Sequence, residues 1–140
     1  MADADIGLVG LGTMGAMLAL NMAEQGYTVA VYNRTRSVTR DFIDGAGDLA
    51  KNLVGCDTYE DLTAAIRKPR AVILMVPAGK PVDAVSADLA THFEAGDMIV
   101  DAGNANFHDT NRRAAEAEAI KVMGIGVSGG AEGARHGPSI

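Results

Sequence analysis

The sequence lacks tryptophan altogether and has a single cysteine, Cys56, in 140 residues. One thiol excludes an internal disulfide framework and fits a reducing compartment, so we expect a cytoplasmic protein. Aromatic residues make up only 4% of the chain, which leaves no platform on which nucleic-acid bases could stack. Acidic residues outnumber basic ones by 18 to 12, for a net charge of -6, and we therefore expect no nucleic-acid partner.

Long hydrophobic runs are also missing. No stretch reaches the roughly 18 uninterrupted apolar residues of a transmembrane helix, so we expect no membrane association. The first five residues include two aspartates and no basic residue, whereas a signal peptide would begin with a basic segment. His92, His108 and His136 show no metal-ligand spacing among themselves or with Cys56, so no metal site is expected. A hydrophobic content of 48% in a chain of this length suits one packed domain, residues 1–140.

Short apolar runs alternate with helix-like segments along the chain. Strands are predicted over residues 6–9, 28–32, 71–76, 98–100 and 122–123, and helices over 14–25, 38–43, 58–67, 81–93 and 109–119. This alternation predicts an α/β fold of three layers, a doubly wound, mostly parallel sheet of the Rossmann type. Ligands of such sheets bind beyond the carboxyl ends of the strands. Turn residues mark those ends here, at Gly10, Asn33, Val76-Pro77-Ala78 and Gly103-Asn104.

A G-x-G-x-x-G motif, Gly10 to Gly15, follows the first apolar run and opens the first predicted helix. Gly10 would permit a tight turn, Gly12 would let the backbone approach a pyrophosphate, and Gly15 would let the helix pack on the strand. The alternative is an ordinary glycine-rich turn. The strand before the motif and the helix after it favour a dinucleotide site.

The end of the second predicted strand, Asn33-Arg34-Thr35, carries no carboxylate. NAD sites usually have an acidic residue there, which accepts a hydrogen bond from the ribose 2′-hydroxyl. An arginine can instead pair with a 2′-phosphate, and Arg36 and Arg40 add positive charge. The alternative is that these arginines form a solvated helix start. The absent acid, together with Arg34, predicts NADP as the cofactor.

Two later segments could either bind a ligand or have a purely structural role, and their residues alone do not decide between the two. Asn104 could contact a nicotinamide or a substrate, or simply form a strand-exit turn. The tail "GVSGGAEGARHGPS", residues 126–139, could form an anion-binding nest with Ser128, Gly129 and Gly130. It could equally be a flexible linker.

Taken together, these motifs resemble the N-terminal coenzyme domain of 6-phosphogluconate dehydrogenases. The resemblance covers residues 4–139 and is carried by "DIGLVGLGTMG", "NRT", "VPAG", "DAGNANF", "DTNRR" and, most specifically, "GVSGGAEGARHGPS". It implies NADP-dependent oxidative decarboxylation of 6-phospho-D-gluconate to ribulose 5-phosphate and CO2, a step of the pentose phosphate pathway. It also implies cofactor contacts from Gly10, Leu11, Gly12, Thr13, Met14, Gly15, Asn33, Arg34, Thr35, Val76, Pro77, Ala78 and Asn104, and substrate contacts from Asn104, Ser128, Gly129 and Gly130.

The sequence departs from the family pattern in places. Pro77 replaces the usual lysine, and Ala105 replaces a serine beside Asn104. In the family, the general-base lysine, the general-acid glutamate and a C-terminal helical domain for catalysis and dimerisation lie beyond the residues present here. We therefore expect no catalytic residue in this chain, and NADP binding without turnover. The alternatives are a stand-alone NADP-binding module and another β-hydroxyacid dehydrogenase-like domain. Because the family dimerises mainly through that C-terminal domain, this chain could be either a monomer or a dimer.

Overall fold

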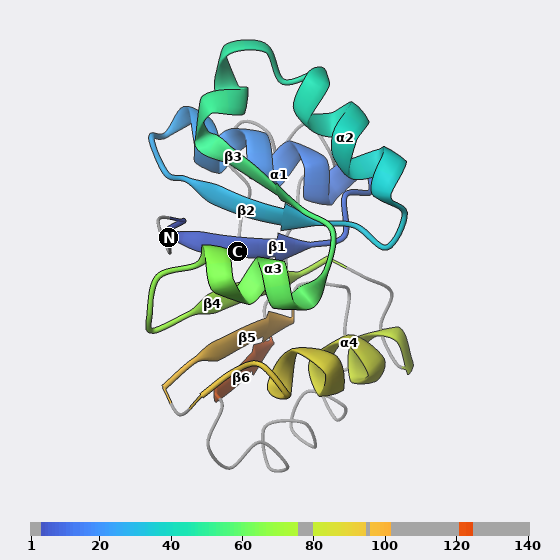
Figure 1. Cartoon of the computed structure of the whole chain (residues 1–140), viewed down its shortest axis with the longest axis vertical. Coiled ribbons are helices and arrows are strands. Elements are labelled where there is room, and N and C mark those ends of the chain that lie inside the picture. The colour runs from blue at the N-terminus through green and yellow to red at the C-terminus, as the bar shows by residue number, and fades with distance from the viewer. Residues whose placement is uncertain (1–3, 76–79, 95, 102–120, 125–140) are drawn as a thin grey trace.

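The computed structural model describes residues 4–75, 80–94, 96–101 and 121–124 (Figure 1). Strands and helices alternate along them, as the sequence predicts. The elements in chain order are β1 (Ile6–Val9), α1 (Thr13–Glu24), β2 (Val29–Tyr32), α2 (Arg36–Asp44), the 3-10 helix η1 (Gly47–Asn52), β3 (Leu53–Cys56), α3 (Tyr59–Ala65), β4 (Ala71–Leu74), α4 (Lys80–Ala90), β5 (Met98–Asp101) and β6 (Lys121–Gly124).

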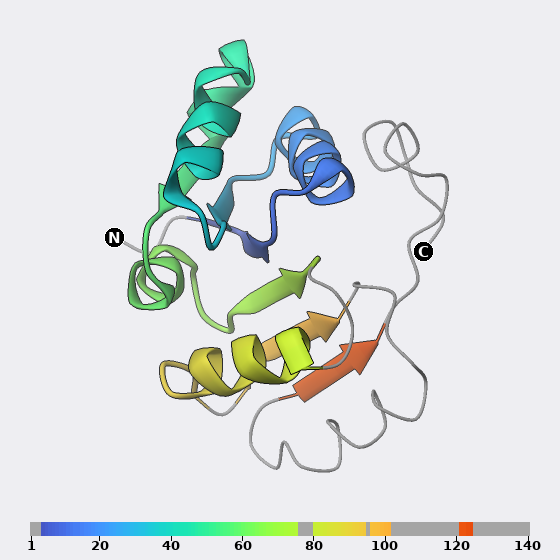
Figure 2. The ribbon, with the colours of Figure 1, turned by 90° about the vertical axis from the view of Figure 1, so that its right-hand side faces the viewer.

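The six strands form one parallel sheet in the order β3-β2-β1-β4-β5-β6. In Figure 2 the arrowheads of β4, β5 and β6 point the same way, and α4 runs beside them. This observation confirms the predicted doubly wound α/β fold. The strand order reverses between β1 and β4, and in such sheets the ligand crevice lies at that reversal, beyond the carboxyl ends of the strands.

Helices cover both faces of the sheet, which makes three layers. Successive residues of a strand point to opposite faces, so Leu8 packs with α1, α2 and η1, while Val9 packs with α3 and α4. Both residues are almost fully buried. A parallel sheet needs such cover on both faces, and its strands therefore read as continuous apolar runs.

The structure differs from the sequence prediction around residues 47–67. The sequence predicts neither η1 nor β3. The apolar run of β3, a strand at the sheet edge, is short and is interrupted by Gly55. A methyl group at Gly55 would lie 2.6 Å from Cδ1 of Ile43, so the glycine allows α2 to pack closely on β3. α3 ends at Ala65 rather than near residue 67, because the next residue, Ile66, forms a parallel bridge with Ala4. The helix predicted over 109–119 lies outside the described residues.

At the amino ends of the strands, aspartates join neighbouring strands. Asp97, just before β5, is 1% exposed and accepts hydrogen bonds from the backbone N–H groups of Arg70 and Glu94, at 2.8 and 2.9 Å. The Arg70 guanidinium pairs with the same carboxylate at 2.9 Å and also donates to the Thr63 carbonyl. Burial raises the pKa of Asp97, but these hydrogen bonds and the arginine charge outweigh it, and the net pKa is lowered.

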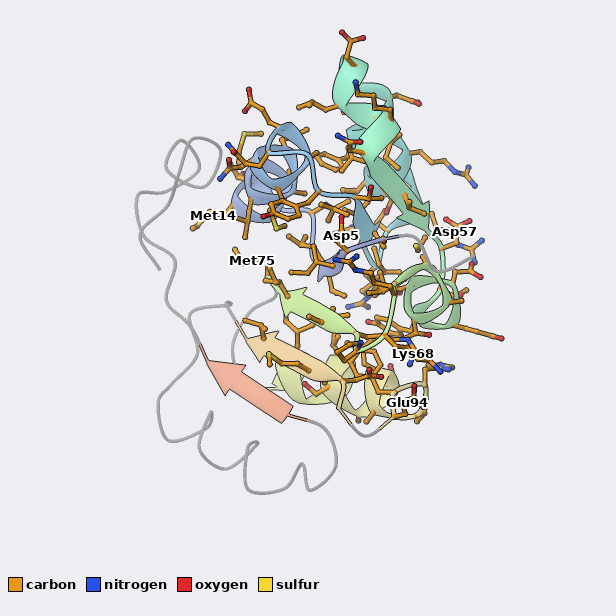
Figure 3. All side chains as sticks on the ribbon, turned by 90° about the vertical axis from the view of Figure 1, so that its left-hand side faces the viewer. Asp5, Met14, Asp57, Lys68, Met75 and Glu94 are labelled. Carbon is orange, nitrogen blue, oxygen red and sulfur yellow. The ribbon has the colours of Figure 1, made fainter. Side chains whose placement is uncertain are left out.

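Asp5 plays the corresponding part before β1. Its Oδ2 accepts a hydrogen bond from the Thr28 N–H at 2.8 Å, just before β2, and its Oδ1 pairs with Arg67 at 2.9 Å. The amino edge of the sheet is thus held by carboxylates. Figure 3 shows another pair at this edge, Lys68 and Glu94. Nζ of Lys68 lies 2.8 Å from Oε1 of Glu94, and both side chains are largely exposed.

Replacing Asp97 with asparagine is expected to destabilise the protein by about 3 kcal/mol at pH 7, since it leaves the largely covered Arg70 charge without its carboxylate partner. The folded-state pKa of Asp97 is lowered, so its contribution is present above the unfolded pKa of about 3.9 and is lost as pH falls through the lower folded value. Urea unfolding followed by circular dichroism at pH 7 and at lower pH would measure both effects. Glu94→Gln is the control and should cost less than about 1 kcal/mol. Equal losses for the two variants would contradict the prediction.

Candidate dinucleotide-binding site

The glycine-rich turn joins β1 to α1 at the carboxyl edge of the sheet. Gly10 has φ of 101°, a conformation that residues with a side chain rarely adopt, and its N–H donates to the Tyr32 carbonyl at 2.9 Å. A Cβ at Gly15 would overlap the Gly10 carbonyl oxygen and approach Cβ of Met75 to 3.3 Å. The two glycines therefore allow α1 to begin directly against β1 and beside the end of β4.

Gly12 has a different role, because it is the N-cap of α1 and its backbone is extended. A methyl group there would meet no described atom within 4 Å, so no described residue fills the space beside the turn. Among the described residues, no side chain caps α1, and its first turn holds no acidic residue. Within the described residues, the first N–H groups of α1 and the positive end of the helix are thus left for an anionic ligand.

The helices α2 and α3 also begin at this edge of the sheet, and they differ in whether a side chain caps the helix start. α3 has a conventional start, since Thr58 Oγ1 accepts from the Asp61 N–H at 3.0 Å and Glu60 and Asp61 lie in the first turn. The Thr-x-x-Asp spacing of these two residues is typical of such a helix start. α2, in contrast, starts at Thr35 without a side-chain cap among the described residues and carries Arg36 in its first turn. Negative charge is thus absent from the starts of α1 and α2, which flank β2.

Asn33 connects the two segments that the sequence predicted to bind the cofactor. Its Oδ1 accepts a hydrogen bond from the Leu11 N–H at 2.9 Å, and its Nδ2 donates to the Thr35 carbonyl at 3.4 Å. The asparagine therefore fixes the glycine-rich turn relative to the end of β2. The sequence predicts only a cofactor contact for Asn33, and the 22-residue separation from Leu11 gives no local signal for this hydrogen bond.

Arg34 extends from the same strand end and is exposed, as are Thr35, Arg36 and Arg40. No carboxylate in the described part of the chain forms an ion pair with Arg34. Its positive charge is therefore not neutralised within that part of the protein. A guanidinium so placed can form paired, charge-assisted hydrogen bonds to a phosphate.

The structure thus brings together the predicted residues Gly10 to Gly15 and Asn33 to Thr35. Figure 3 shows Met14 and Met75 on one side of the molecule, at the arrowhead end of β4. The remaining predicted residues lie outside the described part of the chain: Val76, Pro77, Ala78, Asn104, Ser128, Gly129 and Gly130.

Cys56, the last residue of β3, is a packing residue. It is 4% exposed, and burial, followed by the charges of Asp61 and Asp57, raises the pKa of its thiol to about 11. A thiol in that state is protonated at neutral pH and is a poor nucleophile or metal ligand. Within the described ranges, no group of three or more acidic, histidine or cysteine side chains could hold a metal ion. Nor is any helix there long and apolar enough to cross a membrane.

The parallel sheet with its strand reversal, together with the glycine-rich turn before α1, defines a dinucleotide-binding domain of the Rossmann class. A sequence model described as the NAD binding domain of 6-phosphogluconate dehydrogenase matches residues 5–140. The chain belongs to this family.

Individual relatives agree with this assignment. The decarboxylating 6-phosphogluconate dehydrogenase of Aggregatibacter actinomycetemcomitans is 51% identical over 138 residues, which cover 97% of this chain and 28% of that protein. The Plasmodium falciparum 6-phosphogluconate dehydrogenase, solved in its apo form and in complexes with its cofactor NADP+ and its substrate 6-phosphogluconate, superposes with a TM-score of 0.89. It is 39% identical, and the match covers 96% of this chain and 29% of that one.

A more distant structure shares the fold alone. The Mycobacterium tuberculosis 3-hydroxyisobutyrate dehydrogenase has a TM-score of 0.76 at 23% identity, over 94% of this chain and 43% of that one. The chain spans less than a third of the length of the curated 6-phosphogluconate dehydrogenases it matches.

Proposed function

We propose that this chain binds NADP at the carboxyl edge of its sheet, as the coenzyme domain of a 6-phosphogluconate dehydrogenase. The observation that carries the proposal is a glycine-rich turn that no described side chain fills or caps, next to an Arg34 that no described carboxylate neutralises. The turn fits a pyrophosphate, because no described side chain blocks the approach to Gly12 and the first N–H groups of α1. Arg34 fits a 2′-phosphate, and the absence of a carboxylate at the end of β2 removes the usual NAD contact.

The reaction proposed for the whole enzyme is oxidative decarboxylation of 6-phospho-D-gluconate, with NADP accepting the hydride. The chain's part is to hold the cofactor and, through Asn104 and the Ser128–Gly130 loop, to contact the substrate. The oxidation needs a base for the hydroxyl proton, and the decarboxylation needs an acid to protonate the enediol. We assign neither role to a residue of this chain. A homodimer formed through a helical domain and a cytoplasmic location, which suits the free thiol of Cys56, belong to the same proposal.

Replacing Arg34 with alanine tests the cofactor assignment. The loss of paired, charge-assisted hydrogen bonds is expected to weaken NADP binding by about 10- to 100-fold, while NAD binding stays the same. Isothermal titration calorimetry with both cofactors measures this ratio. Arg40→Ala is a matched control, since Arg40 is likewise an exposed arginine but lies within α2, away from the end of β2; it should change NADP affinity by less than about threefold. An unchanged NADP-to-NAD ratio in Arg34→Ala would overturn the assignment.

The catalytic part of the proposal is tested by following NADPH absorbance with 6-phosphogluconate as the substrate. The 140-residue chain is expected to bind NADP without turnover. Sustained NADPH formation would show that the chain itself supplies the acid and base, and would contradict the division of roles proposed here. Sedimentation of the same sample would distinguish monomer from dimer.

A further inference from the structure

Tyr32 is the last residue of β2, at the edge of the sheet where the glycine-rich turn lies. Its carbonyl accepts the hydrogen bond from the Gly10 N–H at 2.9 Å, and its register partner in β1 is Val9. The preceding residue, Val31, packs with α1 and α2, whereas the Tyr32 side chain points to the opposite face and packs with α3 and α4. The Tyr32 ring therefore lies at the ligand edge of the sheet, on the face that α1 and α2 do not cover.

A second tyrosine, Tyr59, holds this ring in place. It is the first residue of α3 and comes three residues after Cys56, the register partner of Tyr32 in β3. The centroids of the two rings lie 4.4 Å apart, with the ring planes inclined by 38°. Both side chains are only partly buried. Since β2 lies between β3 and the strand reversal at β1 and β4, Tyr59 supports the Tyr32 ring from the β3 side, away from the crevice.

The proposed cofactor site limits where the adenine of NADP can lie. The base and the 2′-phosphate are attached to neighbouring carbons of one ribose, so the base must lie beside Arg34 if that residue binds the phosphate. The Cα atoms of Tyr32 and Arg34 are two residues apart, which is at most about 7 Å. On one face of the sheet α2 begins directly after Thr35 and packs on β2, and on the other face the end of β2 carries the Tyr32 ring. The tyrosine face is thus the side on which a flat base has a surface to pack against.

We propose that the adenine of NADP packs on the ring of Tyr32, which Tyr59 holds in place. This inference rests on the proposed function, because it concerns the same ligand, and it adds a contact for the base to those for the phosphates. An aromatic ring offers adenine a flat apolar surface, and bases stack on such rings with a substantial gain in binding free energy. Because aromatic residues are scarce, the composition predicts no stacking surface, yet the fold brings two of the three tyrosines together.

Isothermal titration calorimetry with two probes tests the contact. The probes are adenosine 2′,5′-bisphosphate and ribose 2,5-bisphosphate, which keeps both phosphates and lacks the base. Tyr32→Leu keeps an apolar side chain but removes the ring, so it is expected to weaken the adenosine compound about tenfold and to leave the ribose compound unchanged. Tyr32→Phe is the matched control, because it keeps the ring, and it should change either affinity by less than about twofold. Equal losses for both probes in Tyr32→Leu, or an unchanged affinity for the adenosine compound, would overturn the inference.

Tyrosine fluorescence provides a second readout that leaves the pair of rings intact. The chain has no tryptophan and three tyrosines, so in Tyr27→Phe the emission comes from Tyr32 and Tyr59 alone. Tyr27 is 55% exposed and precedes β2 at the opposite edge of the sheet, so this change should leave binding unaltered. Adenosine 2′,5′-bisphosphate is expected to quench this emission, after correction for absorption by adenine, and ribose 2,5-bisphosphate is not. Emission that stays unchanged when the adenosine compound saturates the protein would also overturn the inference.

Failure of this inference can be distinguished from failure of the proposed function. A protein that binds NADP more tightly than NAD, but shows neither the quenching nor the loss in Tyr32→Leu, would overturn the adenine contact alone. A protein that binds neither NADP nor adenosine 2′,5′-bisphosphate would overturn the proposed function, and the adenine contact with it.

Discussion

Replacing Gly12 with alanine is expected to abolish NADP binding while leaving the stability of the protein almost unchanged. The backbone of Gly12 is in an ordinary extended conformation, and an added methyl group meets no described atom within 4 Å. The modest loss of N-cap preference is offset by the reduced entropy of the unfolded chain, so we expect a change below about 0.5 kcal/mol. The methyl group would nevertheless occupy the space through which a pyrophosphate approaches the turn. Calorimetric titration with NADP and urea unfolding measure the two effects.

Gly15→Ala is the matched comparison, since it adds the same methyl group three residues along. There the methyl group would overlap the Gly10 carbonyl oxygen, so α1 must move away from β1. A loss of stability of about 3 kcal/mol is expected, along with the loss of binding. If Gly12→Ala binds NADP normally, the open space beside the turn is not the cofactor site.

Replacing Asn33 with aspartate is expected to reverse the cofactor preference. A carboxylate oxygen can still accept the Leu11 N–H, so the turn keeps its position relative to β2. The negative charge of the carboxylate, however, would repel a 2′-phosphate. Its second oxygen could accept a hydrogen bond from the ribose 2′-hydroxyl of NAD. NADP affinity should fall about 100-fold or more while NAD affinity rises, which parallel titrations with the two cofactors would detect.

Asn33→Ala separates this charge effect from the structural contact. It leaves the Leu11 N–H without its acceptor, so both cofactors should bind more weakly and by similar factors. The protein should also lose about 1–3 kcal/mol of stability. Parallel losses of NADP and NAD in Asn33→Asp as well would show that the side chain contributes only the hydrogen bond to Leu11, and that its lack of charge is unimportant.

The sequence predicted the fold well because its signals are local. Continuous apolar runs indicated β1, β2, β4 and β5, and the predicted helix after β1 matches α1 within a residue at either end. β3 escaped prediction for a physical reason: it is an edge strand whose Gly55 breaks the apolar pattern in order to admit Ile43 of α2. That requirement is visible only when the two elements are packed together.

The sequence predicted the individual segments of the candidate site, but not the contacts that join them. The spacing of Gly10, Gly12 and Gly15 predicts a turn, and the structure has that turn. The hydrogen bond from Leu11 to Asn33 and the ring contact between Tyr32 and Tyr59 join residues 22 and 27 positions apart. Such contacts depend on strand order, and no short motif encodes it. The cofactor roles of all these residues stay predictions.

Neighbouring strands are joined by Asp5 and Asp97 at one edge of the sheet and by the neutral Asn33 at the other. Among the described residues, the ion pairs that hold strands together thus lie away from the edge where phosphates would bind. The two edges can consequently accumulate substitutions independently during evolution. A lineage could exchange one nicotinamide cofactor for the other at the end of β2 without any compensating change among the buried charges.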